Sequence, residues 1–124
     1  MTARDVISRH GFDRTVELIQ AGVETAGLKV ISLINAQENL KKIGVQTGGN
    51  RILEVFNPKL AKEVFDHDLR AGIVPPIRIY IYEDRDGTHV SAQNAIELFS
   101  PYNGLTELAR LVDDKIDTLI KTVQ

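Results

Sequence analysis

Cysteine is absent from the 124-residue sequence. A chain without thiols forms no disulfide, holds no Cys-ligated zinc or iron–sulfur cluster, and has no thiolate nucleophile. Redox chemistry at a thiol and cysteine-dependent hydrolysis are therefore excluded.

An excess of one charge sign is also absent, because 15 basic and 17 acidic residues leave a formal net charge of −2. The two signs are interspersed, so there is no basic stripe of the kind that binds phosphate backbones. No apolar run approaches the roughly 20 residues needed to span a bilayer, and the N-terminus lacks an apolar signal region. We expect a cytoplasmic protein that binds neither nucleic acid nor membrane.

What the sequence does contain is enough for one hydrophobic core, with 43% apolar and 26% charged residues. A length of 124 residues lies within the usual range for one compact domain. There is no internal repeat, low-complexity tract or linker. We therefore predict a single domain that spans residues 1–124.

Periodic spacing of apolar residues predicts both helices and strands. Helices are predicted over 14–26, 36–43, from Pro58 onward and over 104–122. Strands are predicted over 28–34, over 51–56 and as a hairpin over 77–92, and the short run 5–8 is counted as the first strand. The predicted fold class is α+β, with a β-α-β-β-β-β-α order, short extra helices and a mainly antiparallel sheet packed by helices.

Two predicted elements have readable ends. The helix over 14–26 has Asp13 as a candidate capping side chain and Gly27 where a left-handed C-terminal cap is wanted. The segment 28–34 is rich in β-branched residues and apolar at nearly every position, which indicates an inner strand. Asn57 followed by Pro58 is typical of a helix start, because Asn caps and Pro fits the first turn.

An ordered series of short motifs covers almost the whole chain. It includes Asn57-Pro58, Pro76-Ile77-Arg78, Tyr82-Glu83 with Gly87, and Val90-Ser91-Ala92. This series resembles the domain-of-unknown-function family 302. The resemblance implies a compact α+β fold of the TATA-binding-protein-like class, often assembled as a homodimer, and it supplies no reaction.

Three positions depart from the pattern that the resemblance implies. Many similar members carry cysteines where this chain has Phe56 and Ile77, and a histidine where it has Asn35. Phenylalanine and isoleucine only pack, and an asparagine is no proton shuttle near neutral pH and a poor ligand for transition metals. Any family function that depends on thiols or on this histidine is not expected here.

The predicted binding residues lie on the strand 77–82. Alternation places Arg78, Tyr80 and Tyr82 opposite the isoleucines, followed by Glu83, on a face that meets solvent, a ligand or a second subunit. Tyr and Arg are enriched in protein interfaces, so a homodimer interface is favoured over a ligand pocket.

Two asparagines each stand at the end of a predicted strand. We expect Asn35 and Asn57 at one edge of the sheet, where they would add polar anchors to a pocket. The alternative is that Asn57 only caps the helix that begins at Pro58.

A rival hypothesis is a metal- or haem-binding enzyme or cofactor carrier that uses Asp66, His67 and His89. Adjacent residues seldom converge on one point, so a solvated helix end is the favoured interpretation of Asp66 and His67. No catalytic motif is present, and no cofactor is indicated. The favoured function is a non-enzymatic homodimeric module that binds a small ligand in a cleft between sheet and helices; a subunit of a larger complex is a third alternative.

Overall fold

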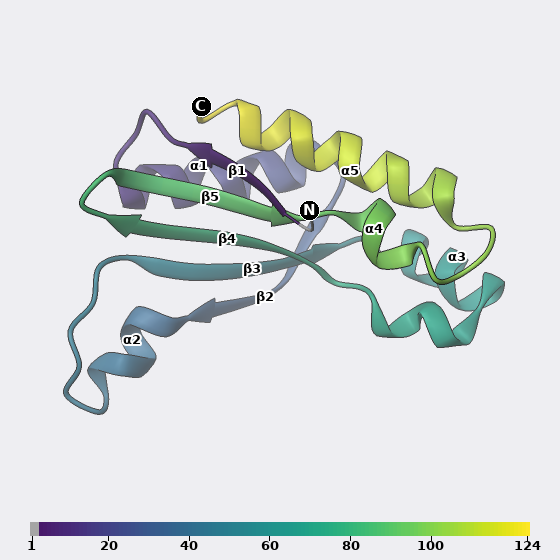
Figure 1. The fold of residues 1–124 in the computed structure, drawn as a ribbon, viewed down its shortest axis with the longest axis horizontal. Helices are drawn as coiled ribbons and strands as arrows, with labels where there is room; N and C mark the ends of the chain where they lie inside the picture. The colour runs from purple at the N-terminus through teal and green to yellow at the C-terminus, as the bar shows by residue number, and fades with distance from the viewer. Residues whose placement is uncertain (1–2) are drawn as a thin grey trace.

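The computed structural model describes residues 3–124, which form one α+β domain with a five-stranded antiparallel sheet in the order β1-β5-β4-β3-β2 (Figure 1). The strands are β1 Ala3–Ile7, β2 Lys29–Asn35, β3 Asn50–Phe56, β4 Ile77–Asp84 and β5 Gly87–Gln93. The helices are α1 Phe12–Thr25, α2 Ala36–Lys41, α3 Pro58–His67, the 3-10 helix η1 Leu69–Ile73, α4 Ala95–Phe99 and α5 Thr106–Lys121. The predicted fold class is confirmed.

One face of the sheet is covered by α1 and α5. The β4 residues Ile77, Ile79 and Ile81 on this face are fully buried, together with Ile19 of α1 and Ile116 of α5. Figure 1 shows α1 behind β1 and β5. We call the other side of the sheet the open face, because no helix in the described chain lies across it.

The strand β2 corrects one prediction, because it lies at an edge of the sheet and not inside it. A β-bulge between Val30 and Ser32 interrupts its ladder with β3. The side chains of Ile31 and Leu33 are left 55% and 41% exposed. A continuous apolar run is the pattern of a strand covered on both faces, but this pattern carries no information about the strand's neighbours within the sheet.

The ends of α1 confirm one expectation and correct another. The helix begins at Phe12 with Gly11 as its N-cap and without a side-chain cap, so Asp13 lies in the first turn as an acidic residue near the positive helix end. Gly27 follows the helix with φ 78°, the left-handed conformation that the sequence predicts.

Residues far apart in the sequence meet at a buried carboxylate in α5. Asp113 is 4% exposed and accepts hydrogen bonds from the backbone N–H groups of Ala95, at 2.7 Å, and Ile96, at 2.9 Å. The Arg4 guanidinium of β1 lies 3.3 Å from Asp113 Oδ1 and 3.0 Å from Asp117 Oδ1. This cluster fixes β1 and the start of α4 against α5.

Within residues 3–124, no helix is long and apolar enough to cross a membrane.

Candidate functional site

The predicted binding residues of β4 divide between the two faces of the sheet. Arg78, Tyr80 and Tyr82 lie on the open face, as alternation predicts. Glu83 points to the opposite side, where its Oε1 accepts a hydrogen bond of 2.7 Å from the backbone N–H of Gly49. Glu83 therefore fixes the approach to β3 and is not part of the open face.

Two hollows on the open face share the residues Arg78 and Gln93. The larger, of about 450 Å³, lies where the sheet meets the segments that contain η1 and α4, and the smaller has about 210 Å³. We call their union the Arg78 groove. Its apolar walls include Ile52, Ile73, Val74, Pro75, Leu98 and Pro101, and its polar lining includes Glu54, Arg78, Tyr80, Ser91, Gln93 and Tyr102.

Arg78 is the cation of this groove. Its side chain is 49% exposed, and its Nε donates a hydrogen bond of 3.4 Å to Glu54 Oε2 on the neighbouring strand. Its backbone N–H donates to Gln93 Oε1 at 3.0 Å. Within residues 3–124 its two terminal guanidinium nitrogens have no acceptor. The groove thus offers N–H donors in the planar arrangement that matches a carboxylate or a phosphate.

A row of stacked rings continues from the groove along the open face. The ring of Tyr80 stacks on Tyr82 at 4.9 Å between centroids, and Tyr82 stacks on His89 at 4.7 Å. Asn50 Nδ2 donates to Tyr80 Oη at 2.6 Å, and His89 Nε2 lies 2.9 Å from Asp84 Oδ1. The ring of Tyr80, which lines the groove, is therefore held in place by its stacking on Tyr82 and by the hydrogen bond from Asn50.

The electrostatics of this row keep one ring neutral and one carboxylate charged. Burial raises the pKa of Tyr82, and the nearby Asp84 raises it further, so this phenol stays protonated near neutral pH. The hydrogen bond with His89 lowers the pKa of Asp84, and a backbone N–H from Asp86 adds to the effect. The row thus ends in a carboxylate that remains ionised down to acidic pH.

The expected meeting of Asn35 and Asn57 is wrong, because they lie at opposite ends of the sheet. β2 and β3 are antiparallel, so Asn35 pairs with Arg51 near the start of β3, whereas Asn57 follows the end of β3. Asn57 Oδ1 accepts from the backbone N–H groups of Lys59 and Leu60, which confirms the capping alternative. Asn35 is likewise the N-cap of α2, and its Oδ1 also accepts from Arg51.

The three residues of the metal-binding hypothesis do not come together in the structure. His67 lies at the end of α3, where its ring packs on Gly104: a Cβ built there would stand 2.0 Å from His67 Nε2. Asp66 pairs with Lys62 on the exposed side of α3, and His89 belongs to the ring row near the other end of the sheet. No group of three His, Asp or Glu in the described chain is placed to hold a metal ion. Neighbouring residues on a helix diverge, and the two histidines are on separate elements.

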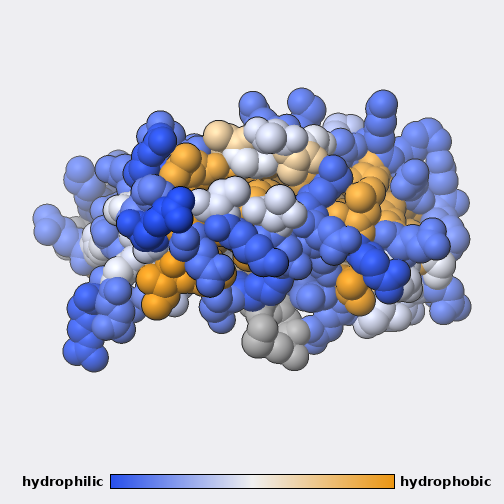
Figure 2. Space-filling model, turned by 90° about the horizontal axis from the view of Figure 1, so that it is seen from above, coloured by the Kyte–Doolittle hydropathy of each residue, from blue (hydrophilic) through white to orange (hydrophobic). Residues whose placement is uncertain are grey.

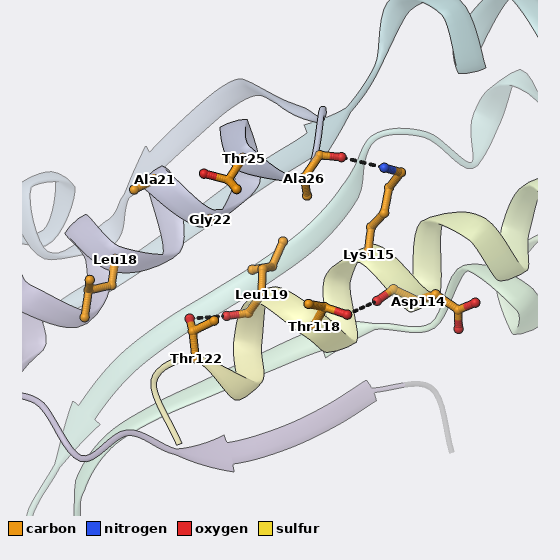
Figure 3. A pocket seen from close by; sticks show the side chains of 10 residues that line it. All are labelled: Leu18, Ala21, Gly22, Thr25, Ala26, Asp114, Lys115, Thr118, Leu119 and Thr122. Atoms are coloured by element: carbon orange, nitrogen blue, oxygen red, sulfur yellow. Dashed lines mark hydrogen bonds between the residues drawn. The ribbon is translucent and has the colours of Figure 1, made fainter.

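A third hollow, of about 540 Å³, runs along the outside of the helical layer between α1 and α5 (Figure 3). Figure 2, seen from the top of Figure 1, shows pale and orange atoms along the middle of this side between blue margins. Thr118 and Thr122 donate their hydroxyl groups to carbonyls of their own helix. Among the described residues that line it, the one cation is Lys115, which already donates to Ala26 O. This groove offers apolar surface but no anchor comparable to Arg78.

Comparison with known families places the whole domain. The family model described as "Domain of unknown function DUF302" matches residues 4–123. The chain belongs to the DUF302 family. The crystal structure of an uncharacterized conserved protein DUF302 from Bacillus stearothermophilus has a TM-score of 0.90 and 22% sequence identity, and the match covers 100% of this chain and 99% of that one. Likeness at this identity shows the fold, and no curated protein matches the chain.

The positions at which the DUF302 resemblance implied reactive residues have structural roles in this chain. Phe56 and Ile77, which stand where many members carry cysteines, are 3% and 0% exposed. The ring of Phe56 packs 6.5 Å from that of Phe99. Asn35, at the histidine position, caps α2. Any DUF302 chemistry that uses those side chains has no counterpart here.

Sequence reasoning missed several residues that line the groove of this DUF302 domain. Ser91 and Gln93 alternate with the buried Val90 and Ala92 in β5, so the register of the hairpin would have placed them beside Tyr80 and Arg78. Tyr102 comes from the turn after α4 and approaches Arg78 only in the folded chain. No local pattern signals that approach.

Proposed function

We propose that the protein is a non-catalytic binding module that takes a small organic acid with an apolar body in the Arg78 groove. The observation that carries this proposal is the meeting of two hollows at one guanidinium whose terminal nitrogens are unbonded within the described chain. A charge-assisted, bidentate contact with a carboxylate is the strongest hydrogen bonding that such a group makes. The apolar walls beside it would hold the hydrocarbon part of the same ligand.

The surroundings of Arg78 favour one acidic group over two. Glu54 Oε2 lies 3.4 Å from Arg78 Nε, so the groove already contains one carboxylate beside its cation. A second negative charge on the ligand would meet Glu54 and be repelled. The two hollows together are of the size of small-molecule sites, which are about 300–1,000 Å³. A monocarboxylate with a ring or a short alkyl chain fits this description.

The non-catalytic part of the proposal is supported by the partners of the polar side chains. His89 lies between Asp84 and the ring of Tyr82, and in the described chain no histidine bonds a serine or threonine hydroxyl. A nucleophile needs a base within hydrogen-bond reach, and within residues 3–124 the Ser91 hydroxyl, which lines the groove, bonds to no histidine or carboxylate. A homodimer that formed through the open face would cover the Arg78 groove. The binding experiment must therefore also report the mass of the assembly.

The test combines native mass spectrometry with ligand titration. A native spectrum of protein purified without metal-affinity resin reports the assembly mass and any retained molecule. Benzoate and octanoate are then titrated into labelled protein, with acetate as the head group alone, and backbone amide shifts are followed by NMR. We expect shifts centred on Arg78, Ser91 and Tyr102, with benzoate or octanoate binding more tightly than acetate.

A matched pair of variants decides whether Arg78 is the anchor. Arg78→Gln should weaken binding at least about tenfold, or about 1.4 kcal/mol, because charge-assisted hydrogen bonds are lost. Arg85→Gln makes the same charge change in the turn of the same hairpin and should leave binding unchanged. Equal affinities for the two variants, or amide shifts that avoid the groove, would refute the proposal.

A further inference from the structure

The two charges that line the Arg78 groove balance each other. Among the described residues of its lining, Arg78 and Glu54 are the charged ones. They stand directly opposite each other on the neighbouring strands β4 and β3, with Arg78 Nε 3.4 Å from Glu54 Oε2. A ligand with a single negative charge would leave the filled groove with an excess of negative charge, and its carboxylate would be repelled by Glu54. The groove is therefore better matched to a ligand that carries a positive charge as well as a carboxylate.

Glu54 has free bonding capacity as well as charge. Its side chain is 20% exposed, and within residues 3–124 the one hydrogen bond of this side chain is that from Arg78 Nε to Oε2. This bond of 3.4 Å is longer than the roughly 2.7–2.9 Å of strong charge-assisted bonds. Its Oε1 accepts nothing from the described chain. Glu54 can therefore accept hydrogen bonds from a ligand while the terminal nitrogens of Arg78 donate to the same ligand.

We infer that the groove binds a free α-amino acid with an apolar side chain, whose carboxylate bonds to Arg78 and whose ammonium group bonds to Glu54. This inference rests on the function proposed above and adds the second charge of the ligand. Because the two protein charges are neighbours, the two ligand charges must also be neighbours, as they are when one carbon carries both. The four groups then alternate in sign, and each charge lies beside an opposite one. A peptide does not fit, since its free ammonium and carboxylate groups belong to different residues.

The walls of the larger hollow would hold the side chain of the amino acid. Pro75, Leu98, Pro101 and Tyr102 line this hollow, which has about 450 Å³. Ile73, which also lines it, is 81% exposed, so a ligand that covers it removes apolar surface from water. Small-molecule sites have about 300–1,000 Å³. The hollow therefore has room for an aromatic or a branched apolar side chain.

Ligands with one carbon skeleton test the two charged contacts separately. L-phenylalanine carries both charges, hydrocinnamate is the same molecule without the ammonium group, and phenethylamine is the same molecule without the carboxylate. L-leucine and isocaproate repeat the comparison with a branched side chain. Dissociation constants are measured near neutral pH from the backbone amide shifts of the natural chain. We expect each amino acid to bind at least about tenfold more tightly than the ligand that lacks one of its charges, because a charge-assisted hydrogen bond is lost.

A matched pair of variants assigns the ammonium contact to Glu54. Glu54→Gln should weaken the binding of L-phenylalanine at least about tenfold. It should leave the affinity for hydrocinnamate unchanged or higher, because the repulsion between two carboxylates is removed. Glu24→Gln makes the same charge change at an exposed side chain of α1, on the other side of the sheet, and should change neither affinity. Circular dichroism confirms that both variants are folded.

The outcomes separate this inference from the function proposed above. If hydrocinnamate and isocaproate bind in the groove and neither amino acid binds more tightly, the inference is overturned, whereas the binding of small organic acids stands. If the advantage of L-phenylalanine survives in Glu54→Gln, the contact between Glu54 and the ammonium group is overturned. If neither the amino acids nor the organic acids shift the amides of the groove, both proposals are refuted.

Discussion

Removing the buried carboxylate of Asp113 should destabilise the fold more than any exposed substitution. In Asp113→Ala, the first backbone N–H groups of α4 lose their acceptor. The Arg4 guanidinium loses its buried carboxylate partner and keeps the more exposed Asp117 and the backbone carbonyls of Gln93 and residue 113. Hydrogen bonds to a charged group contribute about 1.5–3 kcal/mol each, and breaking a buried pair costs about 3–5 kcal/mol. We expect the free energy of unfolding to fall by about 3–5 kcal/mol.

Urea unfolding followed by circular dichroism measures this change. With an m-value of about 1–3 kcal/mol per molar urea, the midpoint should fall by at least roughly 1 M. Asp114→Ala is the matched control, because it removes an exposed carboxylate one residue along the same helix and should change stability by no more than about 0.5 kcal/mol. An Asp113→Ala loss below about 1 kcal/mol would refute the reasoning that this carboxylate holds β1 and α4 in place.

Two further predictions concern the ring row and the approach to β3. The hydrogen bond with His89 lowers the pKa of Asp84 in the folded state. The ionised Asp84 therefore stabilises the fold above the ordinary carboxyl pKa of about 3.9. This stabilisation is lost as the pH falls through the lower pKa of the folded state. The loss of unfolding free energy between pH 6 and pH 3 should therefore be smaller in Asp84→Asn than in the natural chain, and an equal loss would contradict the role of this pair. Gly49→Ala would place its Cβ 2.3 Å from the ring of Phe12, and should lower the free energy of unfolding in urea by about 1–3 kcal/mol. Gly11→Ala is the control, because a Cβ there meets open space, and it should lower the free energy of unfolding less. Equal losses in the two variants would contradict the overlap with Phe12.

The sequence was a good guide to elements that depend on local pattern. The alternation of isoleucine with Arg78 and Tyr80 gave β4 and its two faces, and Asn57-Pro58 gave the start of α3, because each signal depends on the residue's own backbone and near neighbours. The place of β2 at the edge was not readable, since strand order is decided by contacts between distant segments. The helices η1 and α4 were missed because each has only five residues and shows less than two turns of periodicity.

The candidate site was predictable only in part. Arg78 and Tyr80 were placed on the right face by the period of the strand. The prediction that Asn35 and Asn57 lie at one edge of the sheet was wrong. β2 and β3 run antiparallel, so the ends of these two strands lie at opposite ends of the sheet. Tyr102 reaches the groove through the packing of α4 against α5, and no spacing in the sequence encodes that packing.

The pairing of β1 has a consequence for the chain as it is being synthesised. Residues 3–7 bond to residues 89–93, Arg4 pairs with Asp113, and the backbone N–H of Arg9 donates to Val123 O. During synthesis β1 therefore has no partner strand until β5 has followed it, and the ion pair of Arg4 waits for α5. A nascent chain in which α5 has not yet formed would hold β1 on β5 without the ion pair to α5, so this edge of the sheet would be only loosely paired and open to pairing with other chains.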